Sequence, residues 1–221
     1  MPKLIPSKPD HDIYCFIGGA FRPPNHRIWQ MISYFSDLVG DNGQVIVVAS
    51  NPQSSKYVQK HAFQDGRSMP AEDAVKVLEI FAEADGKDNI SFMASGEPSP
   101  VRTIYGLITD PGTISDADVL VGCYNDEADF KKWSTLEARV KEENPSVTLV
   151  DFRKFAFRRS YENFAHGISA LQRRIGGVAL ANEEDAMPSF LSKDQMEQCM
   201  KIIYGENYKE NLKKLKEEEG K

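Results

Sequence analysis

The residues best suited to chemistry lie close together near the N-terminus, in the segment 16–29 that reads FIGGAFRPPNHRIW. Gly18 and Gly19 allow the backbone to approach a ligand closely, and a helix that begins near His26 presents backbone N–H groups to an anion. A short apolar run precedes the glycines, as expected for a strand. The order of strand, glycine-bearing turn and helix therefore predicts a binding site for phosphate groups.

From Gly19 onward this segment resembles the signature loop of the HxGH nucleotidyltransferases, which reads roughly G-x-F-x-P-P-H-x-G-H. In an ungapped alignment Asn25 stands for the first histidine, Arg27 for the glycine and Ile28 for the second histidine. The resemblance implies that the loop shapes a nucleotide-binding pocket. The residues expected to line this pocket are Gly18, Gly19, Phe21, Arg22 and Asn25.

The resemblance also implies a reaction. Enzymes of this family transfer a nucleoside monophosphate from a nucleoside triphosphate to a phosphorylated acceptor, and their two histidines donate hydrogen bonds to the phosphoryl oxygens. Asn25 can still donate through its side-chain amide, whereas Ile28 cannot donate at all. We expect His26 or Arg27 to replace the missing donors. A one-residue slip, which places His26 and Trp29 at the two histidine positions, stays an alternative.

A second segment, residues 166–174, resembles the I-S-x-T-x-x-R signature of the same family. Ile168, Ser169 and Arg174 match it, and Leu171 replaces the threonine. The resemblance implies that Arg174, as a catalytic residue, holds the β- and γ-phosphates through charge-assisted hydrogen bonds, with Ile168 and Ser169 in the nucleotide site. The alternative is a surface arginine on an amphipathic helix.

A polar loop follows the second predicted strand and carries several basic residues. Lys56 and Arg67 are the candidates within it for contact with the acceptor or its phosphate, because the loop starts at the carboxyl end of a strand, where open α/β sheets bind ligands. A solvated loop with ordinary basic residues is an equal alternative.

Apolar runs alternate with amphipathic stretches along most of the chain. The runs predict five strands, at residues 12–18, 44–50, 89–94, 117–123 and 146–152. The amphipathic stretches predict helices at residues 26–39, 71–84, 99–108 and 129–143. This alternation predicts a three-layer, Rossmann-like α/β domain with a parallel sheet of about five strands and right-handed crossovers.

The pattern changes after the fifth strand. We expect a nucleotidyltransferase-like α/β domain over residues 1–152 and a C-terminal helical cap over residues 153–208 that completes the nucleotide site. A charged tail, residues 209–221, mixes Lys and Glu with few apolar residues.

Composition restricts the class of protein. The net charge of −6 disfavours a nucleic-acid partner, although residues 153–159 form a local basic cluster. The number of cysteines is odd and none has CxxC spacing, which disfavours a disulfide framework or a zinc site. Cys15 and Cys123 lie in apolar runs, which favours buried thiols. With no signal peptide or membrane span expected, we predict a cytoplasmic protein without a membrane partner. The chain is similar to phage-type members of the family, and if it is phage-encoded we expect the protein in the cytoplasm of the host cell.

The most direct hypothesis is nucleotidyl transfer from ATP or CTP to a small phosphorylated acceptor. Magnesium is expected as the cofactor, although the sequence contains no recognisable metal-binding motif. The sequence is also compatible with a homo-oligomer. The alternative is a nucleotide-binding or structural protein that reuses the fold without turnover.

Two histidines, His11 and His61, are interpreted as surface residues. Asp126, Glu127 and Asp129 are interpreted as an acidic turn, with a water-mediated Mg²⁺ site as the alternative.

Overall fold

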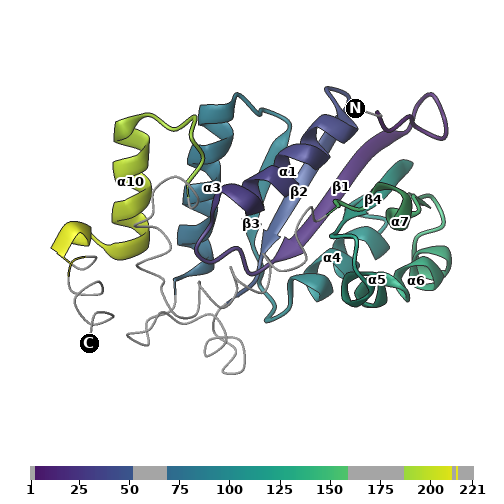
Figure 1. Ribbon diagram of the computed structural model, residues 1–221. Helices are drawn as coiled ribbons and strands as arrows, with labels where there is room; N and C mark the ends of the chain where they lie inside the picture. The colour runs from purple at the N-terminus through teal and green to yellow at the C-terminus, as the bar shows by residue number, and fades with distance from the viewer. Residues whose placement is uncertain (1–2, 52–68, 159–186, 211–212, 214–221) are drawn as a thin grey trace.

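The architecture is a five-stranded parallel sheet flanked by helices (Figure 1). The computed structural model describes residues 3–51, 69–158, 187–210 and 213. All strand pairs are parallel, and the strand order is β3-β2-β1-β4-β5. The strands are β1 (Asp12–Gly19), β2 (Gly43–Ala49), β3 (Ile90–Ala94), β4 (Ala117–Gly122) and β5 (Thr148–Leu149). The predicted three-layer α/β fold is confirmed.

The helices follow the crossovers between strands. The chain steps from β1 to β2 to β3 in one direction and from β4 to β5 in the other, so right-handed crossovers place the first two helices and the later ones on opposite faces. Helix α10 packs against α3, and α4 packs against α6. The helices are α1 (His26–Val39), α3 (Ala71–Asp85), α4 (Pro100–Thr109), α5 (Glu127–Trp133), α6 (Leu136–Glu143), α7 (Phe152–Phe155) and α10 (Lys193–Tyr204).

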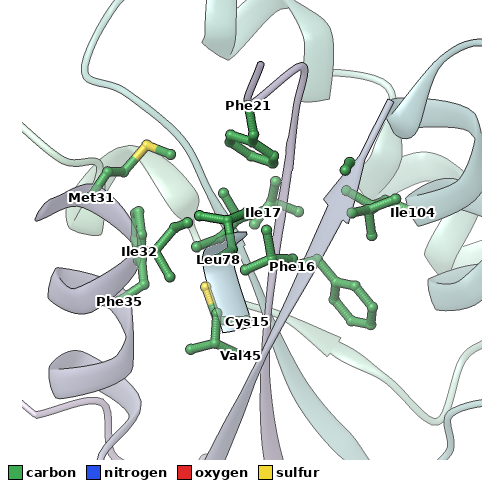
Figure 2. Close-up of a cluster of buried hydrophobic side chains, with 14 of the residues drawn as sticks. Cys15, Phe16, Ile17, Phe21, Met31, Ile32, Phe35, Val45, Leu78 and Ile104 are labelled. Carbon is green, nitrogen blue, oxygen red and sulfur yellow. The ribbon is translucent and has the colours of Figure 1, made fainter. Parts of the chain in front are cut away.

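The central strand β1 is apolar on both faces because helices cover both sides of it. Alternate residues of a strand point to opposite faces, so Cys15 and Ile17 share one face while Phe16 lies on the other. All three are fully buried. Figure 2 shows Ile17 near Ile32 and Leu78, with Phe16 directed away from them. Burying the side chains of Phe16 and Ile17 stabilises the fold by roughly 1.5–3 kcal/mol each.

The fifth strand is shorter than predicted. Only Thr148 and Leu149 pair with β4, whereas the apolar pattern predicts a strand over 146–152. The Asp151 side chain accepts a hydrogen bond from the Arg153 backbone N–H at 3.1 Å, and thereby caps α7. The cap turns the chain into a helix two residues after β5, so the predicted boundary at residue 152 falls at the first residue of α7.

The single helix predicted over 129–143 is two helices. The hydroxyl of Tyr105 on α4 donates to the Lys132 carbonyl at 3.2 Å and lies 2.7 Å from the Thr135 hydroxyl. In a continuous helix the Lys132 carbonyl would accept a backbone N–H from the next turn. Its hydrogen bond with Tyr105 therefore explains the break between α5 and α6. Trp133 stacks on Tyr105 and is buried, so it serves the packing of α5 against α4.

His11 is buried, and its interpretation as a surface residue is wrong. Its Nδ1 lies 3.0 Å from Asp118 on β4, and both residues are less than 10% exposed. The Ser7 hydroxyl donates to the same carboxylate at 2.7 Å, and the Ser7 backbone N–H also donates to it. A carboxylate within a buried strand needs such partners, because an unpaired buried charge is costly. The charged residue Asp118 within the apolar run ADVLVG was therefore the signal in the sequence for a buried polar partner such as His11.

Within the described ranges, no helix is both long and apolar enough to cross a membrane.

The Asp118 carboxylate gives a testable prediction for stability. Burial favours its neutral form, but the bonds from Ser7 and His11 outweigh this and hold the pKa of Asp118 below its ordinary value of 3.8. Because the folded-state pKa is depressed, the contribution is present above about pH 4 and is lost as the pH falls through the folded-state pKa. We expect Asp118→Asn to lower the free energy of unfolding at pH 7 by about 2–3 kcal/mol. Urea unfolding at pH 7 and at pH 3.5 measures this. A difference from the wild-type chain that does not shrink at the lower pH would contradict the linkage.

Candidate functional site

The glycine-bearing loop leaves the sheet where the strand order reverses. β1 lies between β2 and β4, and the chain proceeds from these two strands in opposite directions, so the carboxyl end of β1 is the topological switch point of the sheet. The loop runs from Ala20 to Asn25 and leads directly into α1. The Ser50 backbone N–H donates to the Gly19 carbonyl at 2.8 Å, and the Ser95 N–H donates to the Ala49 carbonyl at 2.7 Å. These bonds align the ends of β1, β2 and β3 at one edge.

Gly18 and Gly19 make room for protein side chains. A Cβ on Gly18 would lie 2.8 Å from Cδ1 of Ile104 and 3.4 Å from Cβ of Pro100, both on α4. A Cβ on Gly19 would lie 2.6 Å from the ring of Phe21. The close approach that the glycines permit is therefore used to pack α4 and Phe21 against the end of β1.

Phe21 covers the end of the strand. It is 6% exposed and adopts a left-handed backbone conformation, with φ of 48°, which is uncommon outside glycine. Its ring lies over Gly19, and Figure 2 shows it above Ile17 at the top of the buried cluster. This conformation carries the chain away from the sheet and directs the following residues toward the start of α1.

Asn25 caps α1. Its Oδ1 accepts hydrogen bonds from the backbone N–H groups of Arg27 and Ile28, each at 3.1 Å, and the residue is 7% exposed. The Trp29 N–H donates to the Asn25 carbonyl as in a regular helix. The sequence pattern predicts that the first N–H groups of this helix bind an anion, but those of Arg27 and Ile28 are already hydrogen-bonded within the protein. The Asn25 side chain acts here as an acceptor at the helix end.

The first turn of α1 carries the other candidate donors. His26 and Arg27 are half-buried, and the His26 Nε2 lies 2.9 Å from Nε2 of Gln30. The indole N–H of Trp29 donates to Asp85 on α3 at 2.9 Å. Trp29 therefore serves the contact between α1 and α3, which weakens the alternative alignment that gives it a catalytic position. Sequence reasoning missed Asp85 because it lies far from Trp29 in the chain.

Arg22 is the most unusual residue of the loop, because its charge is buried. It is 2% exposed. Its Nε donates to the Ala20 carbonyl at 3.3 Å, one terminal nitrogen donates to the Met69 carbonyl at 3.3 Å, and the other donates to the Ser50 hydroxyl at 3.1 Å. Burial lowers the pKa of Arg22, although an arginine side chain still keeps its charge in a protein. Within the described ranges, no carboxylate forms an ion pair with it.

A second helix begins at the same edge. Ser99 occupies the N-cap position of α4, but its side chain makes no capping hydrogen bond. Nearby, the buried Ser95 hydroxyl lies 2.6 Å from the Thr103 hydroxyl and donates to the Glu97 carbonyl at 2.7 Å. The starts of α1 and α4 therefore both lie at the carboxyl edge, with Gly18 next to α4.

The acidic turn after β4 is used for structure. Oδ1 of Asp126 caps α5 by accepting from the Asp129 N–H at 2.8 Å. Asp129 in turn accepts from the Tyr124 N–H at 2.9 Å and forms an ion pair with Lys132. Over the described part of the chain, no group of three or more His, Cys, Asp or Glu residues could hold a metal ion. The interpretation as an acidic turn fits these contacts better than the magnesium alternative.

Cys15 and Cys123 are buried thiols, as predicted, and Cys199 is buried too. Burial raises the pKa of Cys15 well above its ordinary value, and it raises the pKa of Cys123 and of Cys199 to about 12. Thiols in this state are protonated at neutral pH and are poor nucleophiles. None of the three therefore supplies covalent catalysis.

The basic segment after β5 is partly described. Arg153 lies over the rings of Phe152 and Phe130, with its guanidinium carbon 4.9 Å and 5.9 Å from the ring centroids. The same guanidinium lies 4.0 Å from Asp151. This arrangement assigns Arg153 a packing role on α7 and gives no support to a nucleic-acid surface.

Several predicted site residues lie outside the described residues. They are Lys56, Arg67, Ile168, Ser169 and Arg174. The structure brings Gly18, Gly19, Phe21, Arg22 and Asn25 together at one edge of the sheet, and it places His26 and Arg27 on the adjoining helical turn.

Comparison of the chain with protein-family models, with curated proteins and with solved structures gave no match.

The packing around Gly18 gives a testable prediction. We expect Gly18→Ala to lower the free energy of unfolding by about 1–3 kcal/mol, because the added methyl group would overlap Ile104. The matched control is Gly96→Ala at the same edge, where nothing lies within 4 Å of the new Cβ. Equal stability of the two variants in urea would contradict the packing role.

The cap on α1 gives a second prediction. We expect Asn25→Ala to cost about 1 kcal/mol of stability, because two backbone N–H groups would lose their acceptor. Asn25→Asp should retain the stability of the wild-type chain, since a carboxylate also caps and suits the positive helix end. Thermal unfolding by circular dichroism compares them. A destabilised Asn25→Asp variant would show that the amide group has a further partner.

Proposed function

We propose that this protein is a nucleotidyltransferase that moves a nucleoside monophosphate from ATP or CTP to a small phosphorylated acceptor and releases pyrophosphate. The observation that carries the proposal is the position of the signature-like loop. It leaves the central strand at the point where the strand order reverses, and it enters a helix there. This is the place where open α/β sheets bind nucleotides. The transfer reaction itself rests on the resemblance of residues 19–28 and 166–174 to the family signatures.

In the proposed reaction, an oxygen of the acceptor phosphate attacks the α-phosphorus of the nucleoside triphosphate. The bond between the α-phosphorus and the bridging oxygen breaks, and pyrophosphate leaves. The protein aligns the two phosphates and stabilises the charge on their oxygens. His26 and Arg27, on the first turn of α1, are the donors assigned to this task. Arg174 is assigned to the β- and γ-phosphates, and Lys56 and Arg67 to the acceptor.

Magnesium is expected to arrive with the triphosphate. Two carboxylates of the turn after β4, those of Asp126 and Asp129, accept hydrogen bonds from backbone N–H groups. They do not fit a protein-held magnesium site. No step of the proposed reaction is assigned to the ion.

A second candidate function is nucleotide binding without turnover. It is favoured by the chemistry at the two histidine positions, where the Asn25 oxygen is occupied as a helix cap and Ile28 has no donor. Loss of one transition-state donor typically lowers the rate about 10²–10³-fold. Loss of two would leave binding and remove measurable transfer.

The two candidates are separated by measuring binding and turnover on the same protein. We expect isothermal titration with ATP or CTP plus Mg²⁺ to detect binding, and Arg174→Ala to weaken it at least tenfold, because charge-assisted bonds to phosphate are lost. Arg139→Ala is the control, since Arg139 pairs with Glu143 on the exposed surface of α6.

Pyrophosphate release is then followed with a panel of phosphorylated acceptors. Release that depends on Arg174 supports transfer, while binding without release with any acceptor supports the second candidate. If neither nucleotide binds, both candidates fail.

A further inference from the structure

We propose that Arg22 is the anchor of a phosphate-binding site, in which phosphate oxygens of the ligand supply the counter-charge that the protein does not provide. The choice of phosphate over other anions rests on the proposed function. The site itself is inferred from the surroundings of the Arg22 side chain.

The first argument is charge. A buried cation is normally paired with a carboxylate, because removing it from water is costly. Arg22 is 2% exposed, yet all three of its acceptors are neutral oxygens, namely those of Ala20, Ser50 and Met69. An anionic ligand would correct this imbalance.

The second argument is the number of donors. A guanidinium has five N–H groups, one on Nε and two on each terminal nitrogen. Three hydrogen bonds are made within the described residues, one by each nitrogen. Each terminal nitrogen therefore keeps one N–H without an acceptor in the described part of the chain. A pair of N–H donors on one planar group suits the oxygens of a phosphate.

The third argument compares the two ends of the sheet. At the amino end, the buried Asp118 carboxylate receives hydrogen bonds from Ser7 and lies 3.0 Å from the His11 imidazole. At the carboxyl end, the buried guanidinium of Arg22 receives no such charged partner among the described residues. The protein thus provides polar partners for the buried charge of Asp118, which lies away from the candidate site. It provides no counter-charge among the described residues for Arg22, which lies in the loop of that site.

Access to Arg22 requires a local opening. The bonds from Arg22 to Ala20 and Met69 are long, at 3.3 Å, whereas charge-assisted bonds between a cation and an anion are typically about 2.7–2.9 Å. A phosphate can therefore replace one of these carbonyl acceptors with a stronger one. Met69 lies two residues before α3, so we assign the opening to the contact between Arg22 and the segment that leads into this helix.

The first test is the thermal stability of the whole chain with and without pyrophosphate, at ionic strength matched with NaCl and without Mg²⁺. We expect pyrophosphate at 100 times its dissociation constant to raise the Tm by roughly 5–10 °C. Arg22→Lys keeps a positive charge but loses the planar pair of donors, so we expect at least a tenfold weaker response. Arg139→Lys, on the exposed surface, should respond like the wild-type chain. An equal response of Arg22→Lys and the wild-type chain, or no response of either, would overturn the proposal.

A second measurement does not depend on the folding of that variant. Nitrogen-15 NMR detects the Nε–H of arginine, and Ser50→Ala identifies the Arg22 signal by removing one of its acceptors. We expect pyrophosphate to shift this signal, while a signal that stays unchanged at saturating pyrophosphate refutes the site.

The test also separates this inference from the proposed function. If the pyrophosphate response requires Arg22 but the protein transfers no nucleotide, the proposal of a phosphate site stands and the proposal of an enzyme fails. If nucleotide transfer is unaffected in Arg22→Lys, the proposal of an enzyme stands and the proposal of a phosphate site fails.

Discussion

The pairing of β1 with a neighbour on each side is the constraint on which the rest of the structure depends. Both edges of the strand bond to β2 and β4, and helices cover both faces. Residues 15–17 are therefore fully buried, and the strand interior has no room for a polar side chain. Polar chemistry can occur only where the strand begins and where it ends. A buried charge lies near each end of β1: that of Asp118, on the neighbouring strand β4, at the amino end, and that of Arg22, in the loop after β1, at the carboxyl end.

The same constraint determines how much of the fold could be predicted. Strands buried on both faces read as nearly continuous apolar runs, so QVIVVAS and ADVLVGC indicate strands in a parallel sheet without any further information. The sequence also located the glycine-bearing loop between a strand and a helix. The boundaries of α1 are those predicted, because Asn25 caps one end and Gly40 ends the other.

What the sequence could not show depends on contacts between distant residues. Tyr105 divides a predicted helix into α5 and α6 from 27 residues away, and the partner of the Trp29 indole lies 56 residues away. His11 is buried because of a carboxylate 107 residues later. For the candidate site, the residue types in the loop were visible. The Asn25 cap is a local contact, and an asparagine directly before a helix is itself a signal for such a cap. The burial of Arg22 was not visible, because it arises only when the loop packs against the residues that follow β2 and precede α3.

The self-capping of α1 has a consequence for how a site of this kind changes over time. In a protein whose helix end is completed by its ligand, loss of the ligand also costs helix stability, so folding and binding are selected together. Here Asn25 completes the helix end without a ligand. The stability of the helix end is thereby separated from ligand binding, and a substitution that removes only the ligand leaves this helix end complete. A loop of this design can change its activity while the sheet beneath it stays the same.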